Sequence, residues 1–175
     1  MERRMLVVQR DCPARLVPAG TRITIPRDTF VTLTQDLGGS YTVNVGGNLA
    51  RVDGTDADAL GLERLELEFD EGIPGAVSEA HVQQALRSVY DPEIPVNLVD
   101  LGLIYDTRIE GHTVFIRMTL TAPGCGMGPV LVDDVKYRVG KVPNVEAVEV
   151  ELVFDPPWSR EMMSEDAQLE LGVYG

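Results

Sequence analysis

Thr121-Ala-Pro-Gly-Cys-Gly-Met-Gly128 stands between two regular patterns in this chain of 175 residues. An alternating apolar run, Val114 to Leu120, precedes it, and apolar residues at helical spacing follow it from Val130 to Val139. Period-two alternation predicts a strand, and a spacing of three to four residues predicts a helix. The three glycines and the proline between them are typical of a turn. The sequence therefore predicts a strand-to-helix turn that carries the thiol of Cys125 at its tip.

The position of Cys125 leaves two interpretations open. A turn that leads into a helix points free backbone N–H groups and the positive end of the helix dipole at its neighbours. Such surroundings lower the pKa of a thiol, and the thiolate is both the nucleophile and the metal ligand. A free cysteine is also among the most buried residue types and often only fills a core. Position alone does not decide between a functional and a structural thiol.

The sequence on both sides of the turn completes one domain. Asp91 to Asp100 holds two prolines and predicts an extended loop. On both sides of the loop and the turn we expect helices and strands. On the last of these strands, Val148, Val150, Leu152 and Phe154 should face inward. This order predicts an α+β layer, with helices on one face of a small sheet. The expected elements are a helix from Ser78 to Tyr90, strands Leu101–Ile109, His112–Leu120 and Val145–Phe154, a helix from Pro129 to Gly140, and a short last helix capped by Ser159 or Ser164.

The first sixty residues have a different character. Short runs rich in Val, Ile, Thr and aromatic residues alternate there with Gly and Pro, which predicts a small β meander or barrel. The pair Gly46-Gly47 predicts a two-residue hairpin, and no helix is expected to follow it, which argues against a phosphate-binding loop. Residues 61–77 are crowded with acidic side chains and predict a linker. The expected organisation is a β-rich region at 1–60, the acidic linker 61–77 and an α+β domain at 78–175.

The composition narrows the possible functions. The net charge is −13 and no cluster of Lys and Arg extends beyond Arg3-Arg4, so we expect no nucleic-acid partner. No apolar run approaches the ~18 residues that a membrane helix needs, and the N-terminus is not typical of a signal peptide. Two cysteines far apart in the sequence do not make a disulfide framework, which favours a reducing cytoplasm.

Few side chains accompany Cys125 as candidates for chemistry. His81 and His112 have no metal spacing to another ligand, and no base is predicted beside the thiol, which argues against a hydrolase. Asp91, Glu93 and Asp100 are carboxylates that we expect to support the loop and the turn rather than to bind a cation. An iron–sulfur cluster needs about four ligands, and this chain offers Cys125 and at most Cys12, a residue more consistent with a core position. A cluster bound here would need ligands from a second subunit, a small thiol or a partner protein.

Three motifs follow one another in the second part of the chain. They are Asp91-Pro-Glu-Ile-Pro-Val-Asn-Leu-Val-Asp-Leu-Gly-Leu-Ile-Tyr-Asp106, then Met118-Thr-Leu-Thr-Ala-Pro-Gly-Cys-Gly-Met127, then Val153-Phe-Asp-Pro-Pro-Trp158 followed by Met162-Met-Ser-Glu165. In this order they resemble the PaaD/SufT family of iron–sulfur assembly proteins. The resemblance covers 78–172, and residues 10–60 are similar to the extra N-terminal region of longer family members. One departure is Gly126, where many family members have a proline directly after the cysteine.

The resemblance implies an accessory or carrier factor in iron–sulfur protein maturation rather than an enzyme. It implies that Cys125 is the functional cysteine, as a labile cluster ligand or a docking thiol. The turn would be formed by Thr121, Pro123, Gly124 and Gly126. The expected cofactor is a labile iron–sulfur cluster shared between subunits or with a partner. Assembly proteins, client apoproteins and a possible homodimer are the expected partners.

Two other hypotheses stay open. The first is a metal-free adaptor that docks client proteins to the assembly machinery. The second and weaker one is a thiol redox protein that uses Cys125 together with Cys12.

Overall fold

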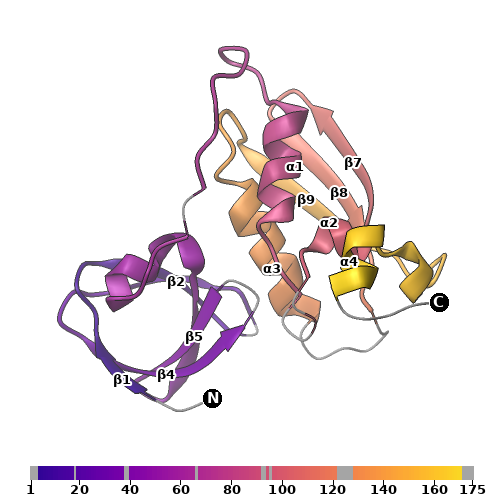
Figure 1. Ribbon diagram of the computed structural model, residues 1–175. Helices are drawn as coiled ribbons and strands as arrows, with labels where there is room; N and C mark the ends of the chain where they lie inside the picture. The colour runs from indigo at the N-terminus through magenta and orange to yellow at the C-terminus, as the bar shows by residue number, and fades with distance from the viewer. Residues whose placement is uncertain are drawn as a thin grey trace. The chain divides into compact units, whose positions relative to one another are not determined.

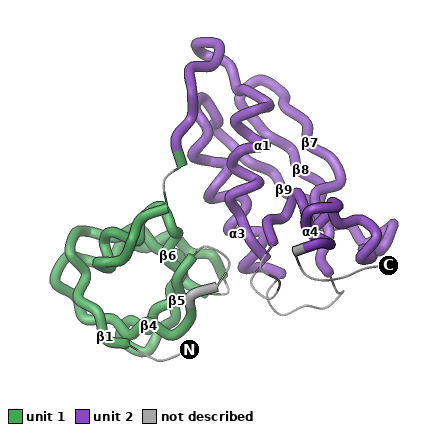
Figure 2. The backbone as a smooth tube through the Cα atoms, in the orientation of Figure 1, with its two compact units in different colours: residues 1–67 green, residues 68–175 purple. Residues whose placement is uncertain are grey.

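The computed structural model describes residues 4–17, 19–37, 40–65, 67–91, 94, 96–121 and 128–170, apart from the side chains of residues 36, 37 and 170. The chain divides into two compact units, Met1–Leu67 and Glu68–Gly175, which Figure 2 shows in different colours. One unit holds a large antiparallel sheet, and the other a small sheet with helices, so the predicted α+β class is confirmed. The division falls within 61–77. Leu62 packs against the core of the first unit, and Phe69 and Val77 pack against that of the second.

The first unit is a six-stranded antiparallel sheet in the order β1-β4-β5-β6-β2-β3, curled into a barrel-like ring (Figure 1). Cys12 begins the second of these strands along the chain. An unpredicted 3-10 helix, η1, follows the last strand, and the side chain of Asp53 caps it by accepting a hydrogen bond from the backbone N of Thr55. The elements are β1 Arg4–Val7, β2 Cys12–Leu16, β3 Arg22–Ile25, β4 Phe30–Leu37, β5 Ser40–Val45, β6 Asn48–Asp53 and η1 Gly54–Leu60.

The turn at Gly46-Gly47 is the predicted two-residue hairpin. Val45 pairs with Asn48 across it, and the two glycines have φ of +56° and +90°. Positive φ at both central residues is the type I′ geometry that matches the twist of flanking strands. A strand follows the glycines, so they do not open a helix and do not form a phosphate cradle.

The second unit is built on a three-stranded sheet, β7 Ile104–Glu110, β8 Thr113–Met118 and β9 Ala147–Leu152, in that order. β7 and β8 form an antiparallel hairpin, whereas β9 runs parallel to β8. A parallel pair needs a crossover, which helix α3, Gly128–Val139, supplies. α3 and α1, Glu79–Arg87, lie over the same face of the sheet (Figure 1). The predicted layer of helices on one face of a small sheet is therefore confirmed.

Local capping explains where the helices begin and end. Ser78 accepts a hydrogen bond from the backbone N of His81 and caps α1, as the sequence predicts. A short helix that the sequence analysis missed, α2, spans Leu98–Leu101. The side chain of Asn97 caps it, and Gly102 ends it with φ +81°. The expectation of a fully extended loop up to Asp100 and a strand from Leu101 was therefore wrong, because these caps fix a helical turn first.

The chain after β9 returns to α2. It forms η2, Arg160–Met162, and α4, Glu165–Glu170. Ser164 Oγ accepts a hydrogen bond from Ala167 N at 3.2 Å, so Ser164 rather than Ser159 caps the last helix. Phe154 was predicted to face inward, but β9 ends at Leu152 and the Phe154 side chain is 44% exposed. The alternation that predicts an inward side chain no longer applies beyond the end of the strand.

Candidate functional site

The candidate site lies at one end of the small sheet. The carboxyl ends of β8 and β9, the amino end of α3 and the helix α2 meet there (Figure 1). A Cβ atom placed on Gly128 would lie 2.9 Å from Leu120 Cδ1. The chain that leaves β8 at Leu120 therefore returns to contact the Leu120 side chain at Gly128, and a larger residue there would require that side chain to shift. The predicted thiol turn occupies the sequence between these two points.

The structure tests only part of the predicted site. Thr121 is half-buried and forms a bend after β8. Pro123, Gly124, Cys125 and Gly126 lie outside the described residues, and so does Glu93. Their assigned roles therefore remain predictions.

Asp91 has the structural role that its position in the sequence predicts. Its side chain is buried, and Oδ1 accepts a hydrogen bond from the backbone N of Ile94 at 3.0 Å. The backbone N of Asp91 donates to the carbonyl of Val96 at 3.2 Å. Asp91 thus shapes the segment that leads from α1 into α2.

Asp100 lies on α2 and joins two helices. Its Oδ2 accepts a hydrogen bond from Asn97 Nδ2 at 2.7 Å, and its Oδ1 lies 3.3 Å from Arg87 Nη1 on α1. Its carbonyl accepts from the backbone N of Ser164 at 2.7 Å. Asp100 therefore ties α2 to α1 through its carboxylate and to the segment after β9 through its carbonyl.

The chain that follows β9, here called the C-terminal segment, braces this end of the sheet, a role not expected from the sequence. Trp158 Nε1 donates to the carbonyl of Leu101 at 2.7 Å, and the Tyr105 hydroxyl donates to that of Pro156 at 2.6 Å. A Cβ atom on Gly102 would collide with the backbone oxygen of Met162. The signal in the sequence was the third family motif, which contains Pro156, Trp158 and Met162.

Cys12 is a core residue of the first unit. Its side chain is fully buried, and burial, with a smaller contribution from the Asp56 charge, raises the pKa of the thiol to about 11. At neutral pH it is therefore a protonated, inaccessible thiol, which does not suit a redox partner. The structural interpretation of Cys12 is confirmed.

The described residues hold no closed metal site. His81 Nε2 lies 2.7 Å from Asp70 Oδ1, and His112 Nδ1 lies 2.9 Å from the carbonyl of Asn144, so each ring is engaged in a separate local contact. Within the described ranges, no three side chains of His, Cys, Asp or Glu converge so as to hold a metal ion. Any metal held by the described part would need ligands from elsewhere.

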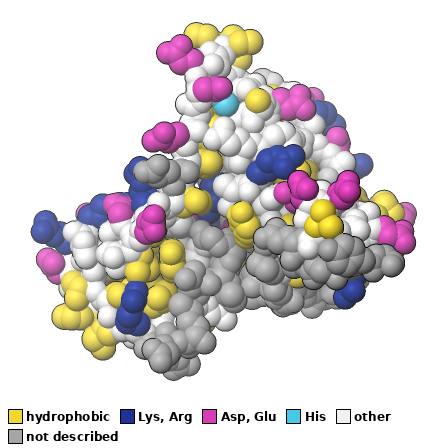
Figure 3. Space-filling view, in the orientation of Figure 1, with side chains coloured by type: hydrophobic (Ala, Val, Ile, Leu, Met, Phe, Trp, Pro, Cys, Tyr) yellow, Lys and Arg dark blue, Asp and Glu magenta, His cyan; other side chains and the backbone are white. Residues whose placement is uncertain are grey.

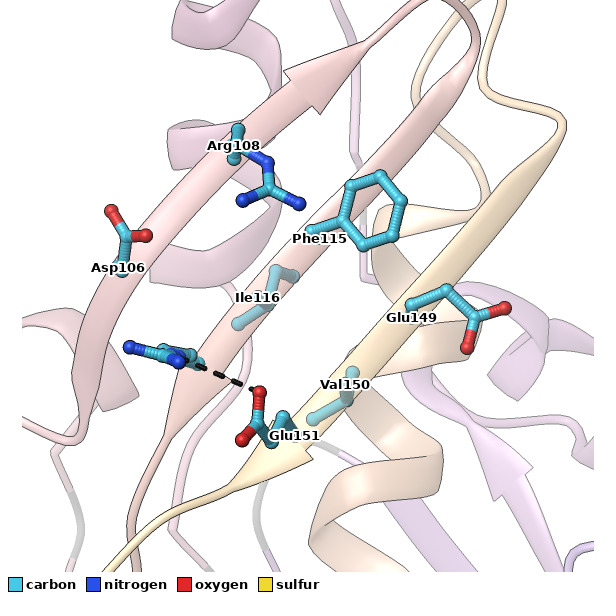
Figure 4. Close-up of a pocket in the computed structure, with 8 residues that line it drawn as sticks. Asp106, Arg108, Phe115, Ile116, Glu149, Val150 and Glu151 are labelled. Carbon is cyan, nitrogen blue, oxygen red and sulfur yellow. Dashed lines mark hydrogen bonds and ion pairs between the residues drawn. The ribbon is translucent and has the colours of Figure 1, made fainter. Parts of the chain in front are cut away.

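A shallow hollow of about 400 Å³ lies on the open face of the small sheet (Figure 4). Its charged side chains are partly paired, since Arg117 Nε lies 3.5 Å from Glu151 Oε2 and the Arg108 guanidinium lies over the Phe115 ring. Asp106 is exposed on this face. Of the predicted site residues that the structure describes, none lines the hollow.

The surface charge agrees with the composition. On the face shown in Figure 3, the described Lys and Arg side chains are scattered among acidic ones and form no continuous basic area. Among the described helices, none has the length and apolar character needed to cross a membrane.

The second unit is a small α+β domain whose described part holds no closed metal site. A family model described as "Iron-sulfur cluster assembly protein" matches residues 79–152. A Fe-S protein maturation auxiliary factor of Porphyromonas gingivalis is 48% identical over 97 residues, which cover 54% of this chain and 91% of that protein. The chain belongs to this iron–sulfur cluster assembly protein family.

Two further comparisons agree. The Fe-S protein maturation auxiliary factor SufT of Staphylococcus aureus is 42% identical over 86 residues, 49% of this chain and 98% of that protein. A crystal structure of a domain of unknown function from Bacillus anthracis, 42% identical, superposes with a TM-score of 0.52 and covers 55% of this chain and 92% of that one. The resemblance to the PaaD/SufT family is thereby confirmed.

Proposed function

We propose that the protein is an auxiliary factor in the assembly or transfer of iron–sulfur clusters, with Cys125 as a labile cluster ligand or docking thiol. The observation that carries the proposal is the similarity over nearly the whole length of relatives named as Fe-S protein maturation factors. Those names describe auxiliary factors, which favours a role other than catalysis.

The small number of cysteine ligands in this chain supports an iron–sulfur cluster that is bound only transiently. Cluster irons are held by about four ligands, mostly cysteine thiolates. Cys12 is buried in the first unit, so Cys125 is the one remaining cysteine of the chain. A cluster held by a single protein thiol needs its other ligands from a second copy, a small thiol or the client. Such a cluster is shared at every stage and can leave when the partner supplies more ligands.

The architecture around the turn supports Cys125 as a thiolate. α3 has 12 residues and begins at Gly128, three positions after Cys125. Helix N-termini carry a partial positive charge that favours an anion nearby. Asp91 and Asp100 are engaged in fixing the segment around α2, which leaves them a supporting role rather than that of metal ligands.

The partners in this proposal are iron–sulfur assembly proteins and client apoproteins in a reducing cytoplasm. A homodimer, in which two Cys125 thiols share one cluster, is one form that the loaded protein can take. The metal-free adaptor remains the competing function, since it needs no ligands beyond those that the described residues provide.

Anaerobic reconstitution with ferrous iron and sulfide tests the carrier function. The full chain should develop a visible absorption band and pass the cluster to an apo iron–sulfur enzyme, whereas Cys125→Ser should do neither. Cys12→Ala is the matched control, because it removes the other thiol of the chain, and it should behave as the unchanged protein does.

The outcomes separate the two functions. No chromophore in the unchanged protein, together with client activity in cells that still depends on the gene, would support the adaptor. Full restoration of client activity in a deletion strain by Cys125→Ser would refute a role for this thiol.

A further inference from the structure

The first unit exposes large apolar side chains at the β1 end of its sheet. Met5 and Phe30 are 69% and 65% exposed, and Val7 is 41% exposed. Leu6 packs against the core, so Met5 and Val7 point to the outer face, where Val7 pairs with Phe30 of β4. Figure 3 shows hydrophobic side chains gathered over this part of the unit. Apolar surface of this kind marks interaction sites.

β1 is also an edge strand with backbone groups left over for pairing. It stands at one end of the sheet, and within the described part of the chain β4 is the one strand paired with it. Val8 N donates to the carbonyl of Thr29 at 2.9 Å, and the bonding direction alternates along an antiparallel strand. The backbone groups of Leu6 therefore point at β4, and those of Met5 and Val7 point at the open edge. Such an edge is a template for another strand.

We propose that the β1 edge is the site at which two copies of this chain associate. An antiparallel pair of β1 strands with a two-fold axis through Leu6 places Met5 of one copy opposite Val7 of the other. These two residues direct their backbone groups at the open edge, so each Met5–Val7 pair exchanges two hydrogen bonds. The edge is thus its own complement, which favours a second copy over an unrelated strand.

The side chains agree with this register. On the outer face, Met5 packs beside Val7 of the second copy, and the Val7–Phe30 pair of each copy extends the apolar surface to both sides of the axis. On the inner face, the two Leu6 side chains meet at the axis. They form a non-hydrogen-bonded pair, in which opposite Cα atoms are about 4.5 Å apart.

The charges permit this association. A net charge of −13 opposes contact between two copies in general, but β1 carries no acidic side chain and has Arg4 as its charged residue. In the proposed pairing Arg4 lies opposite Val8 of the second copy. The carbonyl of Val8 accepts from the backbone N of Asp28, an exposed residue, at 2.7 Å. A cation of one copy therefore comes near an anion of the other at both ends of the pair.

The inference does not depend on the proposed function, because β1 lies outside the residues 79–152 that the family model matches. Two strands of this length make an interface at the small end of the known range, so we expect a dissociation constant on the order of 10 µM.

Sedimentation velocity of the metal-free full chain, measured over a range of concentrations, tests the association. The unchanged chain should pass from monomer to dimer, and Val7→Lys should weaken the dimer at least about tenfold, because it places a charge at the paired edge. Leu49→Lys is the matched control. Leu49 is 42% exposed, close to the 41% of Val7, but lies on β6, so this variant should dimerise as the unchanged chain does.

Disulfide cross-linking in a Cys125→Ser chain tests the register. Leu6→Cys should form a linked dimer under a mild oxidant, because the two Cα atoms at position 6 lie within the about 7 Å that a disulfide allows. Arg4→Cys should not, because the two residues at position 4 are four residues apart along the paired strands, or about 13 Å.

A chain that stays monomeric at about 100 µM, well above the expected dissociation constant, would overturn the proposal. An unchanged dimer in Val7→Lys, or equal cross-linking of Arg4→Cys and Leu6→Cys, would overturn it as well. If the metal-free dimer disappears in Cys125→Ser, the thiol rather than β1 joins the copies, and the proposal also fails. If Val7→Lys does not fold, the cross-linking pair decides alone.

Discussion

Replacing Gly102 by alanine tests whether the C-terminal segment braces the site. Gly102 has φ +81°, and a Cβ atom there would collide with the backbone oxygen of Met162. A residue other than glycine at this φ costs about 1–2 kcal/mol on its own. The displaced segment also carries hydrogen bonds from Trp158 and Ser164 to the carbonyls of α2, each worth about 1 kcal/mol. We expect Gly102→Ala to destabilise the second unit by about 3–4 kcal/mol.

Gly75→Ala separates backbone strain from the collision. Gly75 has a nearly equal φ of +78°, and nothing lies within 4 Å of a Cβ atom placed on it. This variant should lose only about 1–2 kcal/mol.

Trp158 fluorescence makes a urea-unfolding assay specific for the second unit. It is the one tryptophan of the chain and lies in the segment under test, so its fluorescence during urea unfolding reports on the second unit. Gly102→Ala should show a lower midpoint than Gly75→Ala and an altered native emission. Equal midpoints with unchanged emission would refute the bracing role.

Two other predictions follow from capping and burial. Asn97→Ala removes the side chain that accepts from Val99 N and Asp100 N, so we expect a loss of about 1–2 kcal/mol in the same urea assay, and an unchanged midpoint would contradict the cap. For Cys12, the folded pKa of about 11 exceeds the ordinary 9.0, so the stabilisation from this thiol is fully present below pH 9 and is lost as the pH rises toward 11. Cys12 should therefore resist alkylation in the native chain at pH 8, and modification at the rate found in urea would show that it is not a core residue.

Much of the second unit was predictable because its signals are local. Ser78 and the apolar spacing after it define α1, and the alternation from Val114 predicts β8. Helix α2 was not predicted, although Asn97 and Gly102 are ordinary helix-cap residues. The apolar alternation that follows them favoured a strand from Leu101 instead.

The site was less predictable than the fold. The role of Asp91 follows from loop chemistry, whereas Asp100 is fixed by Arg87 and Ser164, which lie far from it in the sequence. Within the described part of the chain the buried Thr119 hydroxyl has no hydrogen-bond partner, a state that depends on every neighbour the fold brings near it. No pattern along the chain carries such information.

The parallel pairing of β9 has a consequence for the order of folding. β7 and β8 close through a two-residue turn, whereas β9 reaches β8 only after the whole of α3 has been traversed. Long-range contacts carry the larger loop-closure entropy, so we expect β9 to dock last and to detach first. The segment with Trp158 follows β9 directly. Its hydrogen bond to the Leu101 carbonyl of α2 should therefore be lost in the same opening event. Transient fraying of one edge strand would then loosen the end of the sheet where the predicted thiol turn begins, while the hairpin stays folded.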